Sequence, residues 1–140
     1  MAQLVQSKVR SYRDLITWQR AMQLAEASYR IASSLPADDR FGLAQQIRRA
    51  AVSIPSNIAE GHNGRTRQVF LNHLAIALGS QAELETELEL ASRLWKAEVS
   101  HAQELATEVG KLLHGLIATI KQAARLPADG CSVSQSERTQ

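Results

Sequence analysis

Apolar residues recur along most of this chain at steps of three and four, which is the spacing of one face of an α-helix. The clearest case is the stretch 41–61, FGLAQQIRRAAVSIPSNIAEG. Its apolar face consists of Leu43, Ile47, Ala50, Ala51, Ile54 and Ile58. A polar stripe on the opposite side consists of Arg49, Ser53, Ser56 and Glu60. Phe41, Arg48 and Val52 belong to a mixed face between the two, so this helix is expected to have neighbours on two sides.

Four helices are predicted by this periodicity and by terminal signals. The first covers about 12–35, with Ser11 and Asp14 as a capping box. The second covers about 40–60; Asp38 and Asp39 suit its positive N-terminal end, and Gly61 is expected to end it in a left-handed conformation. The third covers about 66–95. The fourth runs from Ser100, with Gln103 as its capping-box partner, to about Leu126.

The core seam of the first helix is predicted at Leu15, Trp18, Met22, Ala25, Tyr29 and Ala32. In the second helix, Pro55 removes a backbone donor and crowds the carbonyl of Ala51, which costs ~3 kcal/mol in an isolated helix interior. We therefore expect a kink at Pro55 that packing on both faces compensates. A break near Ser53, with NIAEG as a separate turn, is the alternative.

These segments predict an all-α fold, an antiparallel up-down-up-down four-helix bundle with helix two kinked at Pro55. Residues 1–11 are expected to form an N-terminal arm, 12–126 the bundle, and the polar, aperiodic residues 127–140 a disordered C-terminal tail. Helices two and three carry more apolar surface than one core can use, which predicts a homo-oligomer. Its expected contact residues are Phe41, Val52, Pro55, Ile76, Leu90 and Leu94.

Several stretches match a known family. They are Tyr12, Asp14, Leu15, Trp18, Tyr29, Pro36, FGL from Phe41, Gln45, RRAAVSIPSNIAEG from Arg48, and LAIALGSQAELETEL from Leu74. Over about 12–96 the chain resembles small bacterial four-helix-bundle proteins first noticed as products of intervening sequences in large-subunit ribosomal RNA genes. This resemblance implies a nonenzymatic bundle that assembles as a homopentamer. The accessory variability proteins of diversity-generating retroelements, which bind nucleic acid and a reverse transcriptase, are more distantly similar.

The composition fits one globular domain, with 140 residues, 44% hydrophobic and 21% charged. The single cysteine, Cys131, permits no intrachain disulfide, which suits a reducing compartment. MAQLVQSKVR lacks the apolar run of a signal peptide, and no stretch of about 18 apolar residues occurs. We therefore expect a cytoplasmic protein without a membrane partner.

Charge is distributed unevenly, with a balance of +5 over residues 1–70 and −3 over 71–140. Either the two halves attract each other across helices, or the basic half binds phosphate. The candidate nucleic-acid-binding residues are Lys8, Arg10, Arg13, Arg65 and Arg67. The sequence does not require these two groups to lie at one end of the bundle, and it leaves RNA and DNA equally open. Aromatic residues assigned to core seams would supply little base stacking.

Glu83 and Glu87 lie one helical turn apart between apolar residues, where an unpaired carboxylate is costly. They could form a metal or acid/base pair, or a salt bridge to Arg48 or Arg49 of the second helix. We favour the salt bridge. The predicted structural polar network comprises Gln45, Arg48, Arg49, Asn57, Glu60, Glu83 and Glu87.

The sequence predicts no enzyme, no catalytic residue, no metal and no cofactor. The histidines (His62, His73, His101, His114) are scattered, and the only Glu-x-x-His, Glu98 to His101, falls short of the set that a dimetal bundle uses. The stretch Gly61-His62-Asn63-Gly64 is interpreted as a helix cap and turn, not as an RNA-clamping loop. Two hypotheses follow: an oligomeric nucleic-acid-binding accessory protein, or a scaffold that binds another protein without binding nucleic acid.

Overall fold

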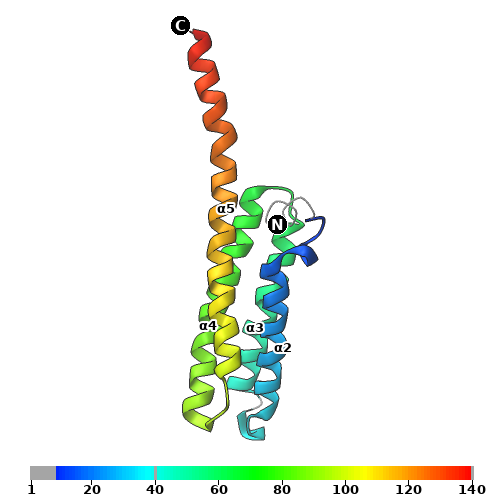
Figure 1. Ribbon diagram of the computed structural model, residues 1–140. Helices are drawn as coiled ribbons and strands as arrows, with labels where there is room; N and C mark the ends of the chain where they lie inside the picture. Colours follow the sequence, from blue (N-terminus) through cyan, green and yellow to red (C-terminus); the bar gives the residue numbers. More distant parts are fainter. Residues whose placement is uncertain (1–8, 40, 140) are drawn as a thin grey trace.

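The computed structural model describes residues 9–39 and 41–139, with side chains described as far as Ala123. Its helices are α2 (Ile16–Ser34), α3 (Leu43–His62), α4 (Arg67–Trp95) and α5 (Ser100–Thr139). Two short 3₁₀ turns, η1 (Tyr12–Asp14) and η2 (Ala37–Asp39), precede α2 and α3. Figure 1 shows these helices as one bundle, which confirms the predicted all-α four-helix fold.

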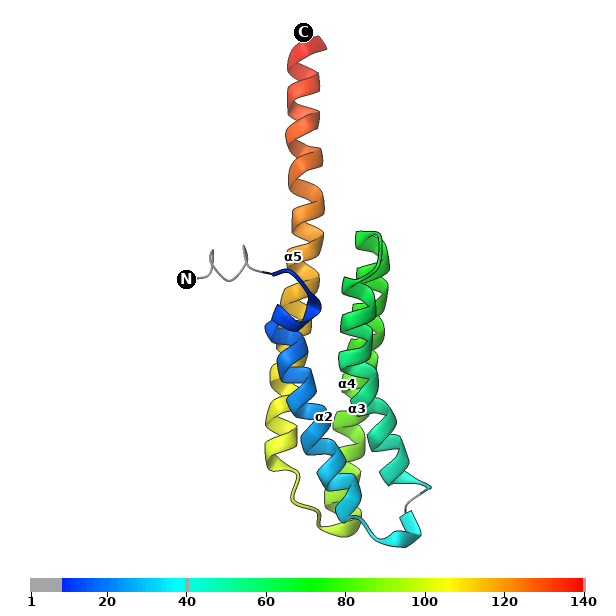
Figure 2. The same cartoon turned by 90° about the vertical axis from the view of Figure 1, so that its right-hand side faces the viewer.

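The bundle encloses its core because each helix packs on the next one along the chain and α2 also packs on α5. In Figure 2 the colours follow the chain down α2, up α3, down α4 and up α5. The start of α2 and the end of α3 therefore lie at the same end of the bundle. The turn η1 also contacts α3 directly.

Apolar spacing predicts the α3 seam given above and, on α4, a seam of Phe70, Leu74, Ala77, Leu84, Leu88, Ala91 and Trp95. Most of both seams is buried, but Leu43 and Phe70 are only partly buried and Trp95 is 42% exposed. On α3 the buried residues include Ala50, Ala51 and the three isoleucines at 47, 54 and 58, and on α4 they include Leu74, Ala77, Leu84, Leu88 and Ala91.

The seam of α2 was predicted only in part. Ala32 is buried as predicted and Leu15, Trp18 and Ala25 pack partly buried against the core, but Met22 and Tyr29 are exposed. The helix also buries Thr17, Ala21, Leu24 and Ser28, which were not predicted. Thr17 and Ser28 made this seam hard to recognise in the sequence, because short polar side chains interrupt an apolar pattern without preventing close packing.

The predicted capping box forms, but it caps the N-terminus of η1 and not that of α2. Ser11 Oγ accepts a hydrogen bond from the Arg13 amide at 3.1 Å, and Asp14 Oδ2 accepts the Ser11 amide at 3.3 Å. Leu15 is extended, with φ −75° and ψ 124°, so α2 begins at Ile16, four residues later than predicted.

Asp39 joins the beginning of α3 to the end of α4. Its Oδ1 accepts a hydrogen bond from the Leu43 amide at 3.0 Å, and its Oδ2 accepts one from Trp95 Nε1 at 3.0 Å. The carboxylate thus satisfies a backbone donor at a helix N-terminus, as predicted, and also fixes the neighbouring helix.

Helix α3 runs without interruption through Pro55, so the alternative of a break near Ser53 is wrong. Pro55 is buried inside the helix, and the kink expected there stays a prediction. The expected left-handed end at Gly61 is also wrong, since α3 continues to His62 and Lys96 is the one positive-φ residue in the described ranges. Gly61 is needed for packing: a Cβ there would lie 2.7 Å from His73 Cβ and 2.9 Å from Phe70 Cδ1.

Helix α4 begins as predicted behind Thr66, whose Oγ1 accepts the Val69 amide at 3.1 Å. The capping box predicted for α5 does not form. Glu98 Oε1 accepts both the amide (3.1 Å) and the hydroxyl (2.7 Å) of Ser100, and these hydrogen bonds lower the pKa of Glu98. The side chain of Gln103 reaches Glu89 Oε1 at 3.2 Å.

Helix α5 does not end near Leu126 but continues to Thr139 and projects beyond the other three helices (Figure 1). The segment expected to be a disordered tail therefore has a helical backbone as far as residue 139. Apolar periodicity reports which helical residues are buried, so its loss marks where α5 leaves the bundle and not where the helix ends.

We predict that Gly61→Ala lowers the free energy of unfolding by about 1–3 kcal/mol, because the added methyl group overpacks the contact with α4. The matched control is Gly115→Ala on α5, where a Cβ would meet no atom within 4 Å. The control should stabilise the chain by about 0.5–1 kcal/mol. Urea unfolding followed by circular dichroism measures both, and equal effects of the two changes would contradict the packing role of Gly61.

We also predict that Asp39→Ala costs about 1–3 kcal/mol of stability, because one change removes the acceptor of the Leu43 amide and that of the Trp95 indole. Asp38→Ala is the control, since its neighbouring carboxylate is exposed and makes neither bond. A Trp95→Phe background should reduce the cost of Asp39→Ala. An unchanged cost in that background would assign the whole effect to the helix cap.

Candidate functional site

Four of the predicted nucleic-acid-binding arginines come from two segments at one end of the bundle. Arg10 and Arg13 precede α2, while Arg65 lies in the link between α3 and α4 and Arg67 opens α4. Because α2 starts where α3 ends, both segments lie at the end from which α5 projects (Figures 1 and 2). We call these four residues the basic end. Lys8, the fifth candidate, lies outside the described residues.

Arg13 is held by aromatic rings. Its guanidinium lies 5.6 Å from the centroid of Tyr12 and 5.7 Å from that of Trp18, and the two rings meet edge to face at 5.3 Å. The nearby carboxylate of Asp14 accepts the amides of Arg10 and Ser11, which lowers its pKa. Cation–π contacts leave the guanidinium charge in place, so Arg13 remains able to meet an anion.

A polar network joins the middle of α3 to α4. Ser80 Oγ donates to Ser53 Oγ at 2.7 Å, and Asn57 Nδ2 donates to the carbonyl and hydroxyl of Ser53 at 2.8 and 3.1 Å. Asn57 Oδ1 lies 2.9 Å from Nδ1 of His73, which is also 3.7 Å from Glu60 Oε2. Asn57 and Glu60 were predicted for a network. The serines and the histidine were missed, although 53, 57 and 60 share the spacing of one α3 face.

The salt bridge predicted for Glu83 or Glu87 is not formed. No ion pair joins either carboxylate to Arg48 or Arg49, all four being described residues. Arg48 turns toward α2, where its guanidinium lies 5.8 Å from the Tyr29 centroid. Glu87 is only 7% exposed, and its buried Oε1 has no hydrogen-bond partner among the described residues. Burial, and then the charge of Glu83, raise the pKa of Glu87 to about 7.

Glu87 lies in an open groove of about 550 Å³ that we call the α3/α4 groove. The groove is lined by Gln46, Gly79, Ala82, Glu83, Thr86, Glu87 and Leu90. A side chain at Gly79 would meet no atom within 4 Å, so the wall of the groove is bare backbone there. The groove combines a buried acid with a surface that another chain can approach closely.

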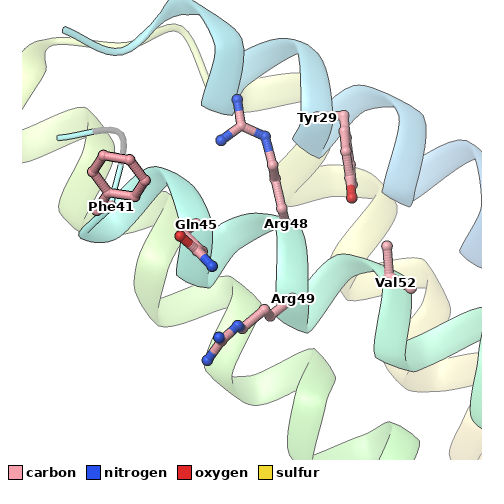
Figure 3. A pocket seen from close by; sticks show the side chains of 6 residues that line it. All are labelled: Tyr29, Phe41, Gln45, Arg48, Arg49 and Val52. Carbon is pink, nitrogen blue, oxygen red and sulfur yellow. The ribbon is translucent and has the colours of Figure 1, made fainter. Parts of the chain in front are cut away.

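A second groove, of about 490 Å³, lies on the other side of α3 and is shown in Figure 3. This α2/α3 groove is lined by Tyr29, Phe41, Gln45, Arg48, Arg49 and Val52. Arg48 and Arg49 leave α3 in different directions, and Arg48 extends toward Tyr29 (Figure 3). Gln45, Arg48 and Arg49, which were assigned to a structural polar network, line an open basic and aromatic surface.

Most of the predicted oligomer contact residues are exposed. Phe41 is 80% exposed, Leu94 61% and Ile76 53%, while Val52 and Leu90 are about half exposed. Pro55 is the exception, because it is buried, although it lines a further groove beside Trp18 and Met22. Exposed apolar side chains on α3 and α4 are typical of surfaces that associate.

In the part of the chain that the structure describes, no three His, Cys, Asp or Glu side chains gather closely enough to hold a metal ion. His62 packs edge-on against Phe70, with centroids 5.6 Å apart, and His73 belongs to the α3–α4 network. Across the same residues, no helix combines the length and the hydropathy that crossing a membrane requires.

Comparison with known proteins identifies a family that this chain matches. A family model described as 23S rRNA-intervening sequence protein matches residues 13–118, which include α2, α3, α4 and the first part of α5. A solved structure of a protein of unknown function from the S23 ribosomal protein family of Bacteroides thetaiotaomicron is 28% identical. It superposes with a TM-score of 0.68, covering 74% of this chain and 96% of that one. No curated protein matches the chain.

The burial of Glu87 predicts a pH-dependent stability. Because the pKa of Glu87 is about 7 in the folded chain against 4.5 for an unperturbed glutamate, the folded state holds its proton more tightly, and this contribution to stability is lost as the pH rises from 4.5 through 7. Glu87→Gln should remove that loss and raise the free energy of unfolding at pH 8 by about 1–2 kcal/mol. Urea titrations of dilute protein across this range measure the effect.

The exposed Glu85 on the same helix provides the control. Glu85→Gln should leave the change in the free energy of unfolding across this pH range the same as in the parent. If the free energy of unfolding of Glu87→Gln varied with pH in parallel with that of the parent, the Glu87 carboxyl would not be desolvated.

Proposed function

This chain belongs to the 23S rRNA-intervening sequence protein family, and on that basis we propose that it is a nonenzymatic, oligomeric accessory protein that binds the backbone of RNA or DNA. The observation that carries the proposal is the basic end, since the segments that carry the arginines, before α2 and in the α3–α4 link, lie at the same end of the bundle. The family name refers to 23S rRNA, which makes a nucleic-acid partner and a cytoplasmic location natural parts of the proposal.

The basic end suits phosphate better than bases. Arg65 and Arg67 are exposed and form no ion pair with another described residue, and Arg13 lies on two aromatic rings that keep its charge in place. Arginine forks match phosphate oxygens, and such contacts hold a nucleic acid without reading its sequence. Binding is therefore expected to depend strongly on salt and weakly on sequence.

Assembly would compensate for the small number of cations. One chain has a net charge of only +2 and offers four arginines at the basic end. Copies held with their basic ends on one side would bind one nucleic acid at several points, which raises the overall affinity without any new kind of contact. The homopentamer implied by the family resemblance is part of this proposal.

The second candidate is a scaffold that binds another protein and no nucleic acid. The exposed side chains of Ile76, Leu90 and Leu94 favour it, because they give α4 an apolar outer face. A scaffold would use its arginines only for solubility, so nucleic-acid binding separates the two candidates.

The test is a titration of fluorescently labelled RNA and DNA with the purified protein at several salt concentrations, followed by anisotropy. The logarithm of affinity should fall linearly with the logarithm of salt, by about 0.7 per phosphate contacted on a single strand and about 0.9 on a duplex. Absence of binding even at low salt would remove the nucleic-acid proposal and leave the scaffold.

The variant Arg65→Glu/Arg67→Glu should lower affinity at least tenfold at low salt and flatten the salt dependence, because it removes phosphate contacts at the basic end. Arg30→Glu/Lys111→Glu makes the same charge change at exposed positions on α2 and α5, so it is the matched control. Equal losses in both variants would mean that net charge alone, and not the basic end, governs binding.

A further inference from the structure

The buried carboxylate of Glu87 lacks a partner among the residues of its own chain that the structure describes. Its Oε1 is buried without a hydrogen bond, Glu83 adds a second negative charge, and neither carboxylate forms an ion pair with another described residue. A desolvated acid without a partner costs folding free energy, whereas a cation brought to it is stabilised more strongly than on an open surface. The α3/α4 groove is therefore incomplete in the isolated chain.

The missing partner must satisfy both the acid and its apolar surroundings. Leu90 lines the groove, and Ile76 is exposed one turn before Ser80 on the same helix. A metal ion or small cation would leave these side chains in water, and a nucleic acid would bring more negative charge to two carboxylates. A protein surface that offers an arginine among apolar and aromatic side chains fits both requirements.

The chain itself has such a surface on the neighbouring side of the bundle. In the α2/α3 groove, exposed Arg49 has no ion-pair partner among the described residues, and Arg48, Tyr29 and Val52 line the same groove. We propose that Arg49 of one copy enters the α3/α4 groove of a second copy and pairs with its Glu83 and Glu87. This inference rests on the oligomer of the proposed function but not on nucleic-acid binding.

The contact joins two different surfaces, so it is heterologous. The two grooves lie on adjacent sides of the bundle and share α3, since α3 packs on both α2 and α4. Copies joined through adjacent sides turn in the same sense at every step, which favours closure into a ring with α3 on its inner side. Gly79 allows the approach, because its bare backbone leaves room for the neighbouring copy.

Two variants interrupt the contact from opposite sides. Arg49→Ala removes the entering cation, and Gly79→Lys fills the groove with a cation of the same chain, one turn from Glu83. Each should weaken self-association at least tenfold in sedimentation velocity and leave a folded monomer. Gly79→Lys should also unfold at the same or a higher urea concentration than the parent, since lysine is a better helix former than glycine.

Gly115→Lys makes the same replacement at the open glycine of α5 and should assemble like the parent. The decisive sample is an equal mixture of the Arg49→Ala and Gly79→Lys variants. The Gly79→Lys copy keeps Arg49 and the Arg49→Ala copy keeps an open groove, so a heterologous contact predicts a dimer of the two and nothing larger.

A parent that stays monomeric at all concentrations, a Gly79→Lys variant that assembles like the parent, or a mixture that forms no dimer would each overturn the inference. Nucleic-acid titration of the same samples separates this result from the proposed function. An assembling parent that binds neither RNA nor DNA would keep the subunit contact and remove the proposed function, and a monomeric parent that binds would do the reverse.

Discussion

The close contact between α3 and α4 is the constraint on which the rest of the bundle depends. Near one end, Gly61 lets Phe70 and His73 approach to a distance that no larger residue allows. In the middle, Ser53 and Ser80 meet directly through their hydroxyl groups, and at the other end Asp39 holds the indole of Trp95. Three different contacts thus hold α3 and α4 in register along their length. Each contact would be broken if one helix slid along the other.

This tight pairing also determines what the outer surface can do. Ser53 and Ser80 face one another between α3 and α4, and longer charged residues line grooves beside this contact. Arg48 and Arg49 line one groove and Glu83 and Glu87 the other, with α3 as the ridge between them. The separation of opposite charges within the chain leaves each of them available to a different molecule.

Much of the fold followed from the sequence, because α3 and α4 bury long aliphatic residues at regular spacing and Thr66 marks a helix start clearly. The α2 seam followed only in part, since Ala32 is buried as predicted but Thr17 and Ser28 also belong to it, while the more apolar Met22 and Tyr29 are exposed. At the candidate sites, the sequence identified the charged residues but not their partners. Whether Arg48 turns toward Tyr29 or toward an acid depends on the rotation of α3, which no local pattern encodes. The basic end could have been inferred, because alternating helix directions bring the start of the first helix beside the end of the second.

The length of α5 gives any ring of these chains two unlike sides. Its helical backbone continues beyond the bundle past the end that carries the arginines, and each residue adds about 1.5 Å to its length. In a ring built by rotation alone, every copy would direct this extension to the same side. A double-stranded nucleic acid approaching that side would meet the projecting α5 helices before it reached the arginines. A single strand, or the free end of a nucleic acid, could pass between these helices. The last helix would then act as a filter for the shape of the partner.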